Sequence, residues 1–363
     1  MKKVPGIAID ARLYNGLSTG DSTYWTQLIN HLLSKDRPFR IGLFSDRPAP
    51  EIAPKVVKQH WRVVRAIHPR VWSLLAFPLA ARRLGYKLIH TQYSVSPFAP
   101  AGSISTIHDI SFKIGPEWFQ SGDLKVLNTS IPITIRDAGA IITVSENSKR
   151  EIELFYPNAV GKTHAIHNGR NLNLTRIPKD EALRIVKTAG IPTPFVLSVC
   201  SIWPRKNIAH IIKAVDALPV DVPHRLVLTG RKHYGELPMS NRAHFTGYVD
   251  EGLLSALYCA ADLYLCPSLH EGFGIPLLEA FHAGCPVICS DRGALPEVAG
   301  EACEIVGLES VQDWTAAIRN LLADSGKLED YRQKGFERAA HFDWETAADQ
   351  TAKIYESCLQ DRA

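Results

Sequence analysis

Short apolar runs alternate with amphipathic segments along the chain, and this alternation predicts parallel sheets covered by helices on both faces. The predicted fold class is therefore α/β. In the first half, strands are expected at residues 4–10, 39–45, 87–91, 103–108, 140–144 and 164–167, and helices at about 20–34, 71–84, 123–138 and 146–154. In the second half, strands are expected at the start of "PFVLSVCSIWPRKN", at 224–230, and in "HFTGYV", "DLYLCPS" and "PVICSD", and helices at about 207–217, 251–260, 276–283 and 311–323.

A polar stretch without periodicity, "NGRNLNLTRIPKDE" from Asn168 to Glu181, separates the two series of strands and helices. Such a stretch is typical of a linker, and 363 residues exceed the size at which one hydrophobic core usually keeps growing. We therefore predict two doubly wound domains, with a single large domain as the alternative. The predicted parts are an N-terminal domain at 1–170, a linker at 171–181, a C-terminal domain at 182–342, and a last helix at 343–363, capped by Asp343, which could pack on either domain.

The composition is that of a folded protein without a membrane span, since 45% of the residues are hydrophobic, 21% are charged, and no apolar run approaches about 20 residues. The first residues, "MKKVPGIAIDARLYNG", predict a strand rather than a signal peptide. All seven cysteines lie in the second half, without a CxxC pair or a zinc-like histidine cluster. We expect a cytoplasmic protein with buried, reduced thiols.

Charge is distributed unevenly. Lys and Arg outnumber Asp and Glu by 11 in residues 1–178, whereas acidic residues are in excess by 7 in the remainder. No acidic residue lies between Glu51 and Asp109, and this gap holds eight basic residues from Lys55 to Lys87 as well as Trp61, Trp72, Leu74, Leu75 and Phe77. A segment of this kind would be attracted to phosphates or to an anionic membrane. A solvated face beside a core-facing helix explains the pattern as well, so peripheral attachment through residues 55–87 is a hypothesis.

Two glutamates stand out in "SLHEGFGIPLLEAFHAGCPVICSD", where Glu271 and Glu279 lie eight positions apart around a Gly-Phe-Gly turn. The glycines allow a ligand to approach the backbone, and the following helix N-terminus favours an anion such as phosphate. Carboxylates accept hydrogen bonds from vicinal hydroxyls, so the two glutamates could hold a sugar and a ribose on either side of a diphosphate. Favourable electrostatics of acidic residues at a helix start explain the spacing equally well.

The region "PSLHEGFGIPLLEAFHAGCPVICSD" followed by "ALPEVAGEA" closely resembles the glutamate-seven-glutamate region of the family 4 retaining glycosyltransferases, which belong to the group 1 glycosyltransferases. Similar stretches occur in the family's order: "TIHDISF", "DAGAIITVSENSKREI", "SVCSIWPRKN" and "GYVDEGLLSALYCAADLYLCPS". The resemblance covers most of residues 85–345 and is weaker over the first 80. It implies the GT-B fold, in which two Rossmann-like domains face each other across a cleft, the N-terminal one binding the acceptor and the C-terminal one the nucleotide sugar.

The resemblance also implies donor-binding roles. Glu279 would accept hydrogen bonds from ribose hydroxyls, Glu271 would engage the transferred sugar, and Lys206 would neutralise the diphosphate. Arg205 would replace the family's partner arginine, because Cys200 and Ser201 occupy the positions where a glycine and, just after it, that arginine usually stand. The remaining residues expected along the donor are Ser201, Gly272, Phe273, Gly274 and Ile275, and, next to the base, Tyr248 and Val249.

In the first domain, the resemblance places His108 near the transferred sugar or the acceptor, with Asp109 beside it. A lone histidine after an apolar strand is otherwise more often a satisfied core residue. Gly20 corresponds to the first glycine of the family's Gly-x-Gly loop, which approaches the phosphate, whereas Ser22 replaces the second glycine. This departure would make the loop stiffer.

Other enzyme classes fit less well. No GxGxxG follows a strand, which argues against a nicotinamide-dependent dehydrogenase or an epimerase. No DxD triad is available for a divalent cation, so we expect neither a metal nor a cofactor, and Lys206 and Arg205 would take the metal's place. "VGKT" at 160–163 lacks the first glycine of a P-loop because Tyr156 stands there.

The predicted function is retaining transfer of a hexose from a nucleotide diphosphate sugar to a glycan or polyprenyl-linked acceptor in surface polysaccharide assembly. GDP-mannose is the favoured donor, because "PRKN" and "TIHDISF" resemble mannosyltransferases, followed by UDP-glucose or a UDP-hexosamine. A non-catalytic sugar-nucleotide-binding protein on the same scaffold is the alternative from another class. No nucleic-acid partner is expected.

Overall fold

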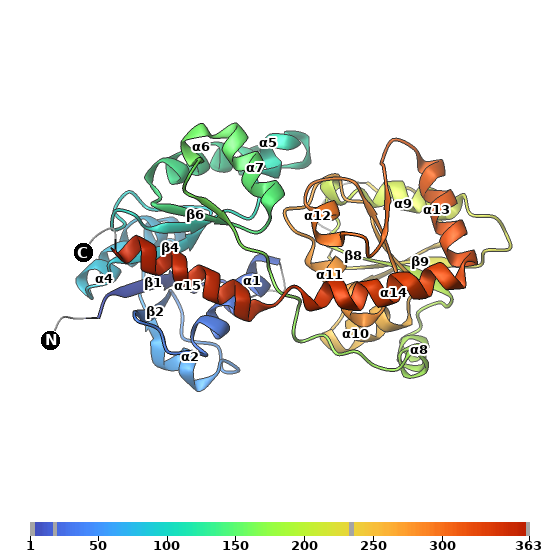
Figure 1. The fold of residues 1–363 in the computed structure, drawn as a ribbon, viewed down its shortest axis with the longest axis horizontal. Coiled ribbons are helices and arrows are strands. Elements are labelled where there is room, and N and C mark those ends of the chain that lie inside the picture. The colour runs from blue at the N-terminus through green and yellow to red at the C-terminus, as the bar shows by residue number, and fades with distance from the viewer. Residues whose placement is uncertain (1–3, 17–19, 232–235, 361–363) are drawn as a thin grey trace. The chain divides into compact units, whose positions relative to one another are not determined.

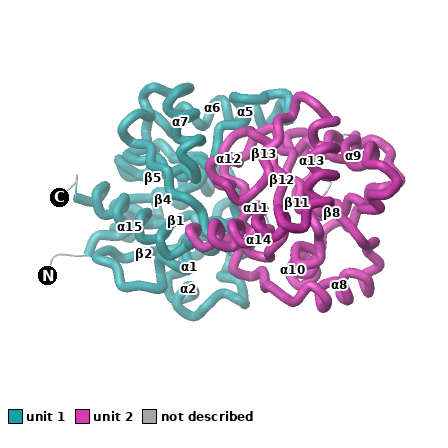
Figure 2. The backbone as a smooth tube through the Cα atoms, turned by 45° about the vertical axis from the view of Figure 1, so that its right-hand side comes forward, with its two compact units in different colours: residues 1–169, 343–363 teal, residues 170–342 magenta. Residues whose placement is uncertain are grey.

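The structure is a computed structural model that describes residues 4–16, 20–231 and 236–360. Backbone contacts divide the chain into two compact units, unit 1 formed by Met1–Gly169 with Asp343–Ala363 and unit 2 by Arg170–Phe342 (Figures 1 and 2). Each unit is built around one parallel sheet. The α/β class predicted from the alternation of apolar runs and amphipathic segments is therefore confirmed.

The sheet of unit 1 has seven strands in the order β3-β2-β1-β4-β5-β6-β7. All neighbouring strands are parallel, which explains their nearly continuous apolar runs, since both faces of such a sheet are covered. The strands are β1 (Gly6–Asp10), β2 (Arg40–Ser45), β3 (Trp61–Val63), β4 (Leu88–Gln92), β5 (Ile104–Thr106), β6 (Ala140–Thr143) and β7 (Thr163–Ala165).

Helices cover the sheet of unit 1. Ile107, Ile135, Ile141 and Ile152 form part of one core cluster beneath α6 and α7, and the last helix, α15, packs along α1. Asp343 caps α15 as the sequence indicates, because its carboxylate accepts the Thr346 amide at 2.7 Å. The helices are α1 (Gly20–Leu32), α2 (Lys55–His60), α3 (Pro69–Val71), the π-helical turn η1 (Trp72–Ala76), α4 (Phe77–Arg83), α5 (Ser111–Ile114), η2 (Pro116–Trp118), α6 (Ser121–Asp137), α7 (Glu146–Phe155), η3 (Pro157–Ala159) and α15 (Trp344–Gln360).

The sheet of unit 2 has six parallel strands in the order β10-β9-β8-β11-β12-β13. The strands are β8 (Phe195–Val199), β9 (Arg225–Thr229), β10 (Ala243–Gly247), β11 (Leu263–Cys266), β12 (Val287–Ser290) and β13 (Glu304–Val306). The helices are α8 (Lys179–Thr188), η4 (Pro204–Lys206), α9 (Ile208–Asp216), α10 (Glu251–Ala260), α11 (Ile275–Ala283), α12 (Leu295–Ala299), α13 (Val311–Ala323) and α14 (Ser325–Ala340).

Each sheet contains a point where the strand order reverses. In unit 1 this switch point lies between β1 and β4, and in unit 2 it lies between β8 and β11. Open parallel sheets bind ligands beyond the carboxyl ends of their strands at such points, because the loops there diverge to opposite faces of the sheet. The loops after these four strands are therefore the first places to look for functional side chains.

Two expectations from the sequence need correction. The helix expected at 71–84 is divided into α3, a π-helical turn and α4. In the basic segment, Trp61, Trp72 and Phe77 are buried, as the core-facing alternative requires, whereas Leu74 and Leu75 are exposed. Two of the seven thiols are partly exposed rather than buried, those of Cys200 and Cys358.

Candidate functional site

The loop after β11 carries Glu271 in a backbone that neighbouring segments hold in place. Ser290 donates to the carbonyl oxygen of Ser268 at 2.6 Å, and the amide of Ala294 donates to the carbonyl oxygen of Glu271 at 2.9 Å. Gly293 has φ +60, and a Cβ there would lie 2.5 Å from the Glu271 carbonyl oxygen, so only glycine fits. Glu271 is thus presented from a fixed loop beside the switch point.

Two cations meet Glu271 from the other side of that switch point. After β8 the chain turns through η4, which places Lys206 Nζ 2.5 Å from Glu271 Oε1 and Arg205 Nη1 3.3 Å from Glu271 Oε2. Arg205 Nη1 also donates to the carbonyl oxygen of His270 at 2.6 Å, and Ser268 donates to Glu271 Oε1 at 2.6 Å. The structure therefore brings Glu271 together with two neighbouring cations that lie 65 and 66 positions earlier in the chain.

Electrostatics keep Glu271 ionised. Burial by itself would raise its pKa, but the charges of Lys206 and Arg205 and the hydrogen bonds from Lys206 and Ser268 outweigh burial and lower the pKa to about 2. A carboxylate with such a pKa carries no proton at neutral pH, so it can accept hydrogen bonds but cannot act as a general acid. With two cations around one anion, the cluster is net positive.

Glu279 occupies a different environment. It lies in the second turn of α11, since that helix begins at Ile275 and has no acidic residue in its first turn, so favourable helix-start electrostatics do not explain it. Its carboxylate accepts a hydrogen bond from the buried hydroxyl of Tyr258 at 2.8 Å. Burial raises the pKa of Glu279, although hydrogen bonds from Tyr258 and Asn171 oppose this. The two glutamates thus differ, one being held by cations and the other by neutral donors.

The other donor-side residues predicted from the sequence lie along the same edge of unit 2. Gly274 precedes α11 with φ +106, and Ile275 is the first residue of that helix. The Phe273 side chain is buried and makes an edge-to-face contact with Phe342 at 5.6 Å, so this side chain belongs to the core. Gly272 lies in the loop with Glu271, Ser201 follows β8, and Tyr248 and Val249 follow β10, where Tyr248 is 56% exposed.

Unit 1 holds the remaining predicted residues. His108 follows β5 and is buried, with its Nε2 3.1 Å from Gln92 Oε1. Asp109 accepts both the amide and the hydroxyl of Ser111, at 2.9 and 2.6 Å, so its carboxylate stabilises a local turn. Gly20 is the first residue of α1, and a Cβ there would meet no described atom within 4 Å, so packing does not require glycine at this position.

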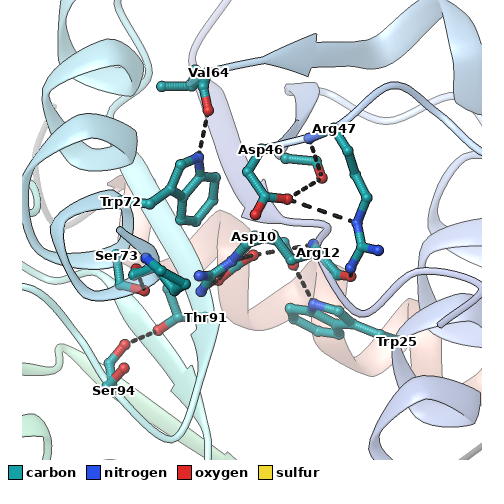
Figure 3. A network of polar contacts seen from close by, with 12 residues as sticks. Asp10, Arg12, Trp25, Asp46, Arg47, Val64, Trp72, Ser73, Thr91 and Ser94 are labelled. Atoms are coloured by element: carbon teal, nitrogen blue, oxygen red, sulfur yellow. Dashed lines mark hydrogen bonds and ion pairs between the residues drawn. The ribbon is translucent and has the colours of Figure 1, made fainter. Parts of the chain in front are cut away.

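A polar network lies at the carboxyl ends of β1 and β2, where Figure 3 labels Asp10, Arg12, Asp46 and Arg47 together with Trp25 and Trp72. Arg12 forms an ion pair with Asp10 at 2.6 Å, and its guanidinium lies 4.0 Å from the ring centre of Trp72. Asp46 and Arg47 follow β2, and their side chains form an ion pair in which Arg47 Nε lies 3.7 Å from Asp46 Oδ1. Sequence reasoning did not single out these residues, because the approach of Arg47 to Arg12 and of Arg12 to Trp72 depends on which strands are neighbours rather than on a motif.

The described part of the chain contains neither a group of side chains placed to hold a metal ion nor a helix that could span a membrane. Among residues 4–16, 20–231 and 236–360, no group of three or more His, Cys, Asp or Glu side chains is placed to hold a metal ion. The helices within these ranges are also too short or too polar to cross a membrane.

Comparison with known families identifies the chain. The family model "Glycosyl transferases group 1" matches residues 181–338, and the model "Glycosyltransferase Family 4" matches residues 19–174. The chain belongs to glycosyltransferase family 4. This membership confirms the resemblance of the glutamate-seven-glutamate region, and most of the transferase's length is covered by the two matches together.

Individual relatives agree with the family. The glycosyltransferase is 29% identical over 309 residues to "O-antigen chain mannosyltransferase B" of Escherichia coli, covering 80% of this chain and 78% of that protein. It is 28% identical over 281 residues to "O-antigen chain mannosyltransferase RfbU" of Salmonella typhimurium, covering 74% of this chain and 75% of that protein. The structure of Anabaena Alr3699/HepE in complex with UDP and glucose superposes on this chain with a TM-score of 0.70 at 21% identity. The match covers 98% of this chain and 100% of that one, and the two share the GT-B fold.

The structure adds residues of the glycosyltransferase that the sequence did not reveal. Ser268 and Tyr258 donate to the two glutamates, and Gly293 allows the close approach of the loop. Ser268 stands three residues before Glu271 and could have been suspected from that spacing. Tyr258 could not, since it comes from α10 and meets Glu279 only through packing of that helix on α11.

Proposed function

We propose that this glycosyltransferase moves a hexose, with mannose from GDP-mannose as the first candidate, to a glycan or lipid-linked acceptor. The transfer retains the anomeric configuration and needs no metal ion. The observation that carries the proposal is the net positive cluster of Lys206, Arg205 and Glu271 at the switch point of unit 2.

The charges of this cluster suit a sugar nucleotide. The diphosphate would bind Lys206 and Arg205, which stabilise negative charge on the leaving group as a metal does in other transferases. Glu271, ionised at neutral pH, would accept hydrogen bonds from hydroxyls of the transferred sugar. Glu279, placed by Tyr258, would accept those of the ribose. The amides around Gly274 at the start of α11 would contact phosphate oxygens.

Retention fits this chemistry. Because Glu271 is held between two cations, it is a weak nucleophile, and we assign it to binding rather than to a covalent intermediate. The acceptor hydroxyl would attack on the face from which the diphosphate leaves, the C1–O bond to phosphate breaks, and the departing phosphate oxygen takes the acceptor's proton. His108 would contact a hydroxyl of the transferred sugar or the acceptor.

Mannose is favoured because both O-antigen relatives named above are mannosyltransferases. UDP-glucose or a UDP-hexosamine is the next candidate donor. On the acceptor side, Asp10, Arg12 and Arg47 offer carboxylate and guanidinium groups at the carboxyl edge of the unit 1 sheet, and such groups bind the hydroxyls of a glycan.

The test is a panel of sugar nucleotides incubated with the purified protein in EDTA, with nucleoside diphosphate release as the readout. GDP-mannose should give the highest rate, and Lys206→Ala and Glu271→Ala should abolish it while remaining folded. Binding of a sugar nucleotide without release or transfer on a broad acceptor panel would instead identify a non-catalytic sugar-nucleotide-binding protein. Dependence of the rate on added Mg²⁺ or Mn²⁺ would contradict metal independence.

A second proposal concerns location. We propose that the glycosyltransferase attaches to the inner face of an anionic membrane through the exposed face of 69–84. There the π-helical turn leaves two consecutive leucines in solvent, Leu74 at 47% and Leu75 at 38% exposure, with Leu79 at 46% one turn on. The basic residues Arg70, Arg82 and Arg83 are exposed on the same segment. Exposed leucines beside arginines favour an anionic lipid surface.

Vesicle flotation tests this attachment. The protein should float with vesicles containing phosphatidylglycerol and not with pure phosphatidylcholine, and Leu74→Ser with Leu75→Ser should abolish flotation. Leu154→Ser is the matched control, because Leu154 is 77% exposed on α7 of the same unit. Equal flotation of the double variant and the control would refute this docking face.

A further inference from the structure

Gln92 lies where three elements of unit 1 meet. It is the last residue of β4, opposite Thr106 of β5 and beside the switch point between β1 and β4. Its side chain contacts two features that the sequence assigned separately to the site. The amide nitrogen donates to the carbonyl oxygen of Asp21 at the start of α1 at 3.3 Å, and the amide oxygen lies 3.1 Å from His108 Nε2.

These contacts determine the orientation of the Gln92 amide. A backbone carbonyl oxygen can only accept a hydrogen bond, so the group that faces the Asp21 carbonyl must be the amide nitrogen of Gln92. The amide oxygen is then the group that faces His108, and it too can only accept. His108 Nε2 must therefore carry a hydrogen, and in the neutral imidazole Nδ1 is left as an acceptor.

Other side chains lie close to the imidazole of His108 without changing this hydrogen-bond pattern. The Asp21 carboxylate, also an acceptor, lies 3.7 Å from His108 Nε2, too far for a direct hydrogen bond. Tyr24, one turn into α1, packs edge-on against the imidazole at a centroid distance of 4.7 Å and restrains the ring plane. No residue in the described ranges forms a hydrogen bond with His108 Nδ1, which is thus available to a substrate hydroxyl.

We propose that Gln92 is a positioning residue, which fixes His108 in the Nε2–H tautomer and ties it to the start of α1. The lone pair of Nδ1 is thereby directed to accept a hydrogen bond from a hydroxyl of the sugar or the acceptor. This inference rests on the proposed function for the identity of that hydroxyl. The tautomer and its dependence on Gln92 are properties of the unliganded protein.

Nuclear magnetic resonance of protein labelled with ¹⁵N-histidine tests the tautomer directly. At about pH 8.5, above the ordinary titration range of histidine, the signals that disappear in His108→Asn belong to His108. They should show a protonated Nε2 and an unprotonated Nδ1. Gln92→Leu should give a mixture of tautomers, whereas Gln92→Glu, which keeps an acceptor, should retain the Nε2–H form. Gln59→Leu, at an exposed position of α2, is the control and should leave these signals unchanged.

Turnover provides the second readout. Gln92→Leu should lower kcat at least about fivefold, the equivalent of one lost hydrogen bond, at a melting temperature near that of the parent. The kcat of Gln92→Glu, which loses the bond to the Asp21 carbonyl oxygen, should lie between the kcat of the parent and that of Gln92→Leu. A protonated Nδ1 in the parent protein, or an unchanged tautomer in Gln92→Leu, would overturn the inference. The absence of transfer with every donor would refute the proposed function instead, since the tautomer would still be measured.

Discussion

Substituting Lys206 by methionine removes one of the two cations around Glu271 while preserving much of the side chain's volume. In the folded protein the pKa of Glu271 is lowered from an ordinary 4.5 to about 2, even though burial opposes this change. The lowered pKa stabilises the folded state by about 3 kcal/mol at pH 7. Removing one partner of a buried ion pair costs about 3 kcal/mol or more, because the other charge remains in a poorly solvated site.

We therefore expect Lys206→Met to lower the free energy of unfolding by about 3 kcal/mol at pH 7. The sign of the pH dependence follows from the direction of the shift. Since the folded pKa of Glu271 lies below the unfolded one, its contribution is complete above about pH 5 and is lost as the pH falls through 4.5 toward 2. The difference between parent and variant should consequently shrink to about 60% of its pH 7 value by pH 3.5.

Urea unfolding followed by tryptophan fluorescence at pH 7, 5 and 3.5 measures this difference. Lys213→Met is the matched control, because Lys213 is exposed on α9 and should change stability by less than about 0.5 kcal/mol. A loss that stays constant from pH 7 to pH 3.5, or a loss below about 1 kcal/mol at pH 7, would refute the assignment of Lys206 as the main counter-charge of Glu271.

Three further changes have defined outcomes. Tyr258→Phe removes a donor to Glu279 and should raise the donor KM about fivefold, the equivalent of about 1 kcal/mol, in steady-state kinetics; an unchanged KM would separate Tyr258 from nucleotide binding. Gly293→Ala, at φ +60 with its Cβ 2.5 Å from the Glu271 carbonyl oxygen, should cost about 2 kcal/mol of stability; calorimetry showing an unshifted melting temperature would contradict the close approach. Arg205→Lys keeps the charge but loses the forked geometry, so it should lower kcat/KM about tenfold or more; parent-like kinetics would limit Arg205 to a structural role.

Much of the fold could be predicted because parallel strands buried on both faces have continuous apolar sequences. The expected helices 251–260 and 311–323 coincide with α10 and α13. In contrast, α14 was not predicted, because its buried positions, Gly335 and Ala339, are small rather than strongly apolar. The three-residue strand β13 at the sheet edge was missed as well, since it is too short to show a period.

For the candidate site, the sequence indicated several residues but not the long-range contacts that hold them. The glutamate-seven-glutamate resemblance indicated Glu271 and Glu279, and the resemblance of "SVCSIWPRKN" indicated Lys206, because these residue types occur in the order and spacing of known motifs. The motif did not reveal that Tyr258 donates to Glu279, or that Gln92 contacts His108. Both contacts depend on which elements pack together, and no local pattern encodes such long-range packing.

If the cluster around Glu271 binds a sugar nucleotide and supports retaining transfer, proton NMR of the product formed from GDP-α-mannose and a glycan acceptor in EDTA should show an α-linked mannoside. This product should be absent when Lys206 is replaced by methionine. A β-linked product would contradict retention, and an undiminished yield from Lys206→Met would contradict the assignment of the donor site.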